Sequence, residues 1–155
     1  MIKVIFLSFI IFLPLGAVET FIVLKVNNEI ITNTDIENET RYLVALNNEL
    51  KNTDKKIINK LAKESIIREK IKKNEISKYF EFDNTKEILD VVIKDYYEKL
   101  AIRDLEDFKL YLKDYNLELD VVKDKIEIEL LWNRLIGSKY KNQIIINKEI
   151  LKDNM

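Results

Sequence analysis

Glycine and proline are almost missing from this chain, which has two glycines and one proline among 155 residues. Because tight turns depend on these two residues, their scarcity argues against an all-β sandwich or barrel with many turns. Lysines and acidic residues are interspersed along the sequence, which is typical of solvent-exposed helix faces. We therefore expect a mainly α fold: one domain of about five to six helices, with a short N-terminal β-hairpin and a short C-terminal strand.

The N-terminal residues differ from the rest of the chain. Lys3 precedes an almost wholly apolar run over residues 4–13, and Ala17 follows just before the sequence becomes polar. A charged start, an apolar stretch of about 7–15 residues and a small residue at its end predict a secretory signal peptide. We expect residues 1–17 to be removed and residues 18–155 to form the domain outside the cytoplasm. An uncleaved N-terminal anchor is the alternative.

The chain contains neither cysteine nor histidine. It therefore cannot form disulfides, and zinc sites draw mainly on these two residue types. Triads of the Ser-His-Asp kind lack their base, and two glycines cannot build a glycine-rich phosphate loop. A net charge of −1 offers no electrostatic footprint for nucleic acid. We predict no catalytic residue, no metal, no cofactor and no nucleic-acid partner, while a carboxylate pair assembled by the fold stays open.

The first elements can be placed from their turn and cap residues. Residues 21–32 are β-branched and apolar on both sides of Asn27-Asn28, which predicts a hairpin with a two-residue turn. One extended strand is the alternative. Thr34 and Glu37 have the spacing of a capping box, so we expect the first helix to begin there.

Apolar periodicity predicts the remaining elements. Four more helices are expected over about residues 54–73, 84–100, 104–115 and 119–136, and then a strand over residues 143–146. We expect Asn84 and Asp104 to be N-caps and Asn74 to be a left-handed C-cap. The helix over residues 119–136 carries apolar rows on nearly opposite sides. This pattern is typical of a helix that is packed from both sides or covered by a partner.

The segment over residues 26–36, VNNEIITNTDI, resembles the opening of the N-terminal domain of the SurA family. This family comprises periplasmic chaperones and peptidyl-prolyl isomerases of Gram-negative bacteria. Further segments are similar to later parts of that domain, in the same order: residues 61–76, 104–108, 132–135 and 144–146. The resemblance spans about residues 22–150.

The resemblance implies an ATP-independent periplasmic chaperone module that binds unfolded outer-membrane protein segments. In the family, parvulin-type isomerase domains follow this domain, and parvulin activity is associated with a histidine-containing site. This sequence ends where the first such domain would begin and has no histidine, so no catalytic residue is carried over. The alternative is part of a peptidyl-prolyl cis-trans isomerase whose parvulin domain is missing or encoded separately, which a proline isomerisation assay would test.

Several apolar and aromatic side chains exceed what one stripe per helix requires. Aromatic rings offer large contact areas to extended peptides. We predict a peptide-binding groove lined by Val91, Tyr96, Tyr97, Ile128 and Trp132. The alternative for each is packing against another helix. A third hypothesis is that a homodimer partner or a second chain covers apolar surface that this chain leaves exposed.

Overall fold

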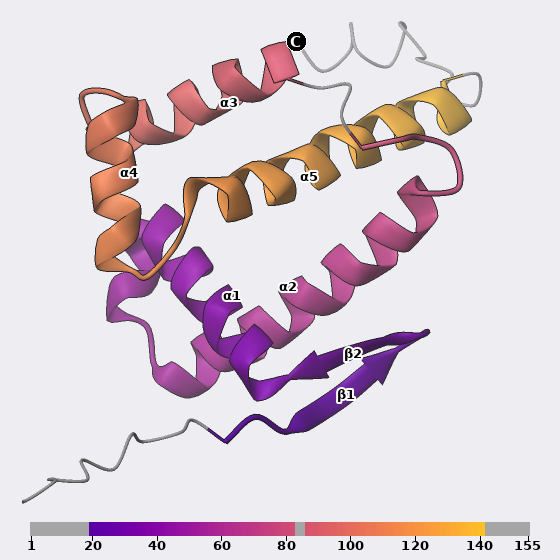
Figure 1. The fold of residues 1–155 in the computed structure, drawn as a ribbon, viewed down its shortest axis with the longest axis horizontal. Helices are drawn as coiled ribbons and strands as arrows, with labels where there is room; N and C mark the ends of the chain where they lie inside the picture. The colour runs from indigo at the N-terminus through magenta and orange to yellow at the C-terminus, as the bar shows by residue number, and fades with distance from the viewer. Residues whose placement is uncertain (1–18, 83–85, 142–155) are drawn as a thin grey trace, which may run out of the picture.

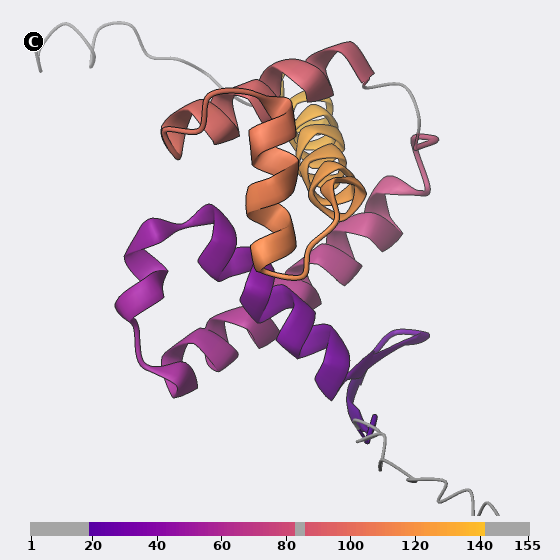
Figure 2. The same cartoon turned by 60° about the vertical axis from the view of Figure 1, so that its left-hand side comes forward.

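The computed structural model describes residues 19–82 and 86–141, and these form a mainly helical fold with an N-terminal hairpin (Figure 1). The elements are β1 (Ile22–Val26), β2 (Glu29–Thr32), α1 (Asn33–Leu46), the 3-10 helix η1 (Asn48–Asn52), α2 (Lys55–Ile76), α3 (Lys86–Lys99), α4 (Leu105–Asp114) and α5 (Leu119–Tyr140). Figures 1 and 2 both show α3, α5, α2 and the hairpin in that order from top to bottom. The prediction of a mainly helical domain with an N-terminal hairpin is confirmed.

The hairpin follows the predicted turn. Strands β1 and β2 pair antiparallel, and Val26 faces Glu29 across the two-residue turn. Asn27 takes a positive φ of 53°, a conformation that asparagine tolerates better than most residues. The ammonium of Lys70 on α2 lies 2.6 Å from a carboxylate oxygen of Glu29 and ties the turn to that helix.

Helix α1 begins two residues earlier than predicted. Thr32, the last residue of β2, is the N-cap: its hydroxyl accepts a hydrogen bond from the Asp35 N–H at 3.2 Å. The Asp35 carboxylate in turn accepts from the Thr32 N–H at 2.8 Å, which completes a capping box. The prediction of Thr34 as the cap is wrong, because the strand passes directly into the helix.

The end of α2 also differs from the prediction. The helix continues past Asn74 to Ile76, and Asn74 is not a left-handed cap. Ile76 is fully buried against Ile128 and Leu131 of α5, and burial of such a side chain outweighs the preference of asparagine for a helix end.

Two further cap predictions have different outcomes. Asp104 caps α4 as predicted, since its carboxylate accepts a hydrogen bond from the Asp107 N–H at 2.9 Å. Asn84 and the strand over residues 143–146 lie outside the described residues.

The described residues form three apolar core clusters, and α5 contributes to two of them. Cluster one joins α1, α3, α4 and α5 around Phe108 and Leu112. Cluster two joins the hairpin, α1 and α2 around Ile31. Cluster three joins the ends of α2 and α5 around Ile76. In α5, Val122 and Ile126 belong to cluster one, whereas Ile128 belongs to cluster three. The prediction that this helix packs on two sides is therefore confirmed.

Within residues 19–82 and 86–141, no helix combines the length and the apolar character needed to cross a membrane.

Candidate functional site

Three of the five predicted binding residues lie on α3. Val91 is exposed, with 65% of its surface accessible. Tyr96 and Tyr97 are half-buried and pack against cluster one. The Tyr97 ring centroid lies 6.1 Å from that of Phe108, so this tyrosine takes part in the aromatic core.

The other two predicted residues lie on α5, in a different part of the molecule. Ile128 is buried in cluster three, and the half-buried Trp132 packs against the same cluster. The structure therefore brings Ile128 and Trp132 together, and Tyr96 and Tyr97 together, but it places the two pairs in separate clusters. Of the five residues, Trp132 borders the groove described next.

A groove of about 350 Å³ lies between the hairpin turn and the C-terminal turns of α2 and α5. We call it the terminal groove. Its apolar lining consists of Ile71, Trp132, Leu135, Ile136 and Tyr140. Leu135 is buried, whereas Ile71 and Tyr140 are exposed by 48% and 46%. The groove therefore has a fixed apolar floor and accessible apolar walls.

Charged residues form one rim of the terminal groove. The Glu75 carboxylate accepts a hydrogen bond from Lys78 at 2.6 Å and from Lys139 at 3.1 Å. These two ammonium groups, Lys78 first, lower the pKa of Glu75. Among the described residues, two cations and one carboxylate leave this rim with a net positive charge. Because Lys139 belongs to α5 and Glu75 to α2, the same contacts hold the two helix ends together.

Cations also lie over the aromatic rings near the terminal groove. The Lys139 ammonium is 4.5 Å from the Tyr79 ring centroid, and the Lys72 ammonium is 5.9 Å from the Trp132 ring. Tyr79 and then Glu75 raise the pKa of Lys139, so this lysine stays charged at neutral pH. Contacts of this kind restrain the aromatic side chains and keep positive charge beside the groove.

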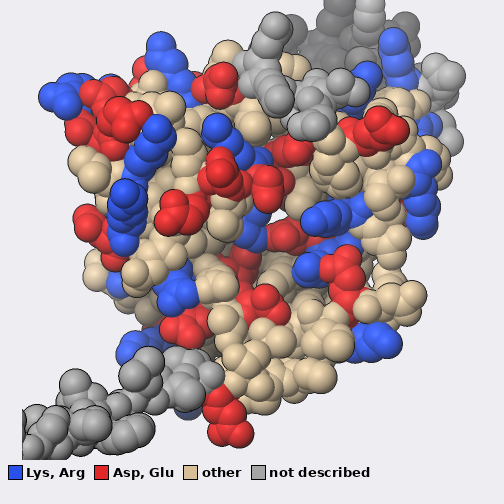
Figure 3. Space-filling model, in the orientation of Figure 1, with Lys and Arg blue, Asp and Glu red and all other residues tan. Residues whose placement is uncertain are grey.

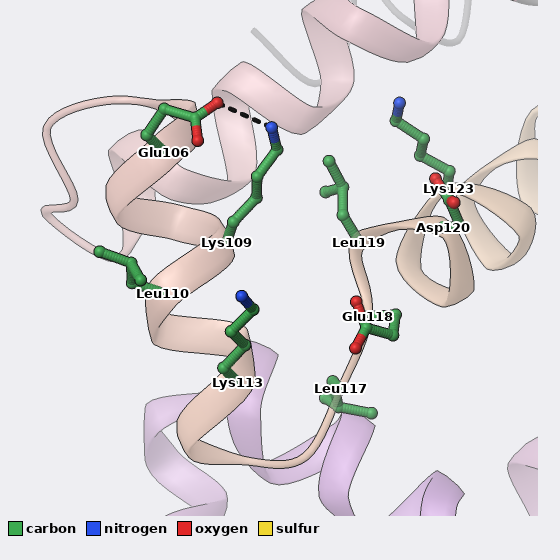
Figure 4. A pocket seen from close by; sticks show the side chains of 9 residues that line it. All are labelled: Glu106, Lys109, Leu110, Lys113, Leu117, Glu118, Leu119, Asp120 and Lys123. Atoms are coloured by element: carbon green, nitrogen blue, oxygen red, sulfur yellow. Dashed lines mark hydrogen bonds and ion pairs between the residues drawn. The ribbon is translucent and has the colours of Figure 1, made fainter.

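A larger pocket of about 480 Å³ lies between α4 and the start of α5 (Figure 4). Three leucines line it, but six charged side chains do so as well: Glu106, Lys109, Lys113, Glu118, Asp120 and Lys123. Glu106 and Lys109 form an ion pair at 2.7 Å across its edge. A pocket surrounded by opposite charges is less suited to apolar ligands than the terminal groove.

A buried charged cluster joins α1, α2 and α5 in the interior. The Lys125 ammonium lies 2.6 Å from a carboxylate oxygen of Glu39 and also forms an ion pair with Glu69. Glu39 is only 2% exposed, and its second oxygen has no hydrogen-bond partner. Burial alone lowers the pKa of Lys125, but Glu69 and Glu39 outweigh burial and raise it.

Tyr42 completes this cluster. Its ring centroid lies 4.9 Å from the Lys125 ammonium. Burial, followed by the neighbouring Tyr96 and Glu39, raises the pKa of Tyr42. A buried phenol whose pKa is raised in this way stays neutral at neutral pH. Within residues 19–82 and 86–141, no group of three or more acidic residues is arranged to hold a metal ion.

Sequence reasoning missed two walls of the terminal groove, Ile71 and Tyr140. The sequence did indicate a second contact surface at Ile71, because this residue lies off the main apolar face of its helix. It did not indicate Tyr140, because the helix was expected to end at residue 136 rather than at Tyr140.

The comparisons with known proteins add nothing to this geometry: no protein-family model, no curated protein and no solved structure matches the chain.

Proposed function

We propose that this chain is a binding module that holds extended, apolar polypeptide segments without ATP. The observation that carries the proposal is the terminal groove, where Ile71, Trp132 and Tyr140 present apolar surface that is accessible from solvent. Ligand sites are usually concave and mostly apolar, with a few polar groups at their edges. The terminal groove is concave, and apolar residues make up half of its lining, beside Asn27, Asn74, Glu75, Lys78 and Lys139.

The groove favours weak binding. Its volume of about 350 Å³ suits a few side chains of an extended segment rather than a whole folded surface. Burial of apolar area drives such contacts, and each buried aliphatic or aromatic side chain contributes about 1.5–3 kcal/mol before the cost of ordering the segment. We expect dissociation constants in the micromolar range, which suit a protein that must release its clients.

The proposed clients are unfolded outer-membrane proteins in the periplasm. Two features of the sequence support this choice: the signal-like N-terminal segment and the resemblance to the N-terminal domain of SurA-family chaperones. Segments of such clients expose aliphatic and aromatic side chains before they insert. A chaperone of this kind needs no nucleotide site, no metal and no catalytic residue.

Trp132 is the only tryptophan of the chain, so its fluorescence reports directly on the groove. We expect unfolded outer-membrane protein segments that lack tryptophan to change the Trp132 emission in a saturable manner. Ile71→Ala should weaken this binding about three- to tenfold, because it removes accessible apolar surface from the groove wall.

Ile57→Ala is the matched control. Ile57 lies on the same helix and is similarly exposed, at 53% against 48% for Ile71, but it does not line the groove. Its substitution should leave the affinity unchanged. Equal losses in the two variants, or no saturable signal at all, would overturn the proposal.

A second candidate function rests on a different surface. Three large apolar side chains of the hairpin segment, Phe21, Ile22 and Ile30, are exposed. Figure 3 shows that the surface over the hairpin is mostly uncharged, whereas charges of both signs cover the helices above it. A second copy of the chain or another polypeptide could cover this patch, and the module would then be a subunit rather than a free chaperone.

A further inference from the structure

The rim of the terminal groove carries more positive than negative charge, although the chain as a whole is slightly acidic, with a net charge of −1. Lys78 and Lys139 share a single carboxylate, that of Glu75. The side chain of Lys78 is 58% exposed and that of Lys139 is 38% exposed. Both lysine side chains are therefore accessible at the rim of the groove.

This surplus charge lies beside apolar surface rather than on an open helix face. Lys78, Lys139, Trp132 and Tyr140 all line the same groove. A segment that places an apolar side chain against Trp132 brings its neighbouring residues close to the two lysines. An acidic neighbour would meet complementary charge, and a basic neighbour would meet like charge.

We infer that the terminal groove selects, among apolar polypeptide segments, those in which an aromatic or aliphatic residue is followed or preceded closely by Asp or Glu. This inference rests on the proposed function, because it assigns the ligand class of the same groove. Apolar burial supplies most of the affinity, and the lysine pair supplies the choice between segments.

The lowered pKa of Glu75 is consistent with this arrangement. Lys78 and Lys139 favour the ionised form of Glu75, so one carboxylate is shared by two lysines at this rim. Removing the charge of Glu75 makes the rim more positive, and removing the charge of Lys78 makes it neutral. The two substitutions therefore change the selectivity in opposite directions.

The test uses three short blocked peptides that share a phenylalanine-containing apolar core and differ only in one flanking residue, which is Asp, Asn or Lys. Binding to the full chain is followed by Trp132 fluorescence at low ionic strength. We expect the Asp peptide to bind about two- to fivefold more tightly than the Asn peptide, and the Lys peptide to bind more weakly than both. The preference should disappear at high salt, where exposed charges are screened.

The variants make the test specific. Glu75→Gln should enlarge the preference for the Asp peptide over the Asn peptide, and Lys78→Gln should abolish it. Lys109→Gln is the matched control, because Lys109 also pairs with a glutamate three residues before it, at 2.7 Å, but lies outside the terminal groove. Circular dichroism checks that each variant keeps its helical content.

Two failures are distinguishable. Equal binding of the three peptides, or equal effects of Lys78→Gln and Lys109→Gln, would overturn the charge selectivity and leave the proposed function standing. No binding of any peptide would overturn the proposed function and this inference together.

Discussion

At the scale of single residues, Lys125 has the most demanding environment among the described side chains. Its ammonium pairs with Glu39 and Glu69, which come from two other helices, and lies over the ring of Tyr42. Glu39 is almost completely buried. Desolvation of these charges cancels much of their attraction, so the cluster adds little net stability. It does make the relative positions of α1, α2 and α5 specific, because any shift would leave a buried carboxylate without its partner.

Substitution of Lys125 tests whether this lysine neutralises the buried carboxylate of Glu39. Lys125→Met should lower the free energy of unfolding by about 3–5 kcal/mol, because it leaves the carboxylate of Glu39 buried without its cationic partner. In a Glu39→Leu background, the same substitution should lower the free energy of unfolding much less. Urea denaturation of the parent protein, the two single variants and the double variant measures both values in a double-mutant cycle.

Lys94→Met serves as the control for this cycle. Lys94 is 62% exposed and pairs with Glu98 at 3.7 Å, so its loss should change stability by no more than about 0.5 kcal/mol. Equal losses for Lys125→Met in the two backgrounds would show that Glu39 is not the charge that Lys125 neutralises.

At the scale of elements, side-chain caps determine where the helices begin. Thr32 and Asp104 each accept a hydrogen bond from a backbone N–H in the first turn of their helix. Such caps satisfy donors that have no partner within the helix. Around α1, Thr32 and Thr34 are each followed three residues later by an acidic residue, although only Thr34 was predicted from the sequence as the cap. The hairpin decides between them, because β2 extends up to Thr32.

We expect Thr32→Ala to lose about 0.5–2 kcal/mol of stability and Asp104→Ala to lower the urea midpoint as well, because in each variant a first-turn N–H loses its acceptor. Thr34→Ala, which changes the same residue type two positions later, should stay within about 0.5 kcal/mol of the parent protein. The urea denaturation midpoints of the three variants and the parent protein measure these changes. A loss at Thr34 that matched the loss at Thr32 would place the cap where the sequence alone had suggested.

At the scale of the whole molecule, α5 connects the parts of the core. It supplies Val122 and Ile126 to cluster one and Leu131 to cluster three, and its Lys125 pairs with Glu39 and Glu69. The hairpin, α1 and α2 form cluster two on the other side of α5 from α3 (Figures 1 and 2). The terminal groove lies where α2 and α5 end together, at the edge of this arrangement.

Exposed apolar side chains occur at several separate places on the molecule: Ile22 and Ile30 on the hairpin, Ile88 and Val91 on α3, and Leu110 on α4. A stable dimer needs one continuous face of about 800 Å² on each partner. We therefore expect the purified chain to sediment as a monomer at concentrations on the order of 10 micromolar. A dimer in sedimentation velocity that Ile30→Ser converts to a monomer would favour the second candidate function.

Several features of the fold could be predicted from the sequence alone. The helical content, the turn at Asn27, the cap at Asp104 and the two-sided packing of α5 all match the expectation. Each depends on residues that are close together in the chain: a turn residue, a cap and its first turn, or an apolar repeat within one helix.

The candidate site was mostly decided by tertiary structure. Of the residues predicted to bind peptides, Trp132 lines the terminal groove, whereas Tyr96 and Tyr97 pack in another cluster. The walls of the groove, Ile71 and Tyr140, lie far apart in the sequence and meet only because α2 and α5 end side by side. The periodicity of apolar residues shows that a helix has an apolar face. It does not show which neighbouring element buries that face, or which part of the face stays exposed. Those outcomes depend on contacts between distant residues, such as Ile76 with Leu131 and Lys125 with Glu39, and only the packed structure determines them.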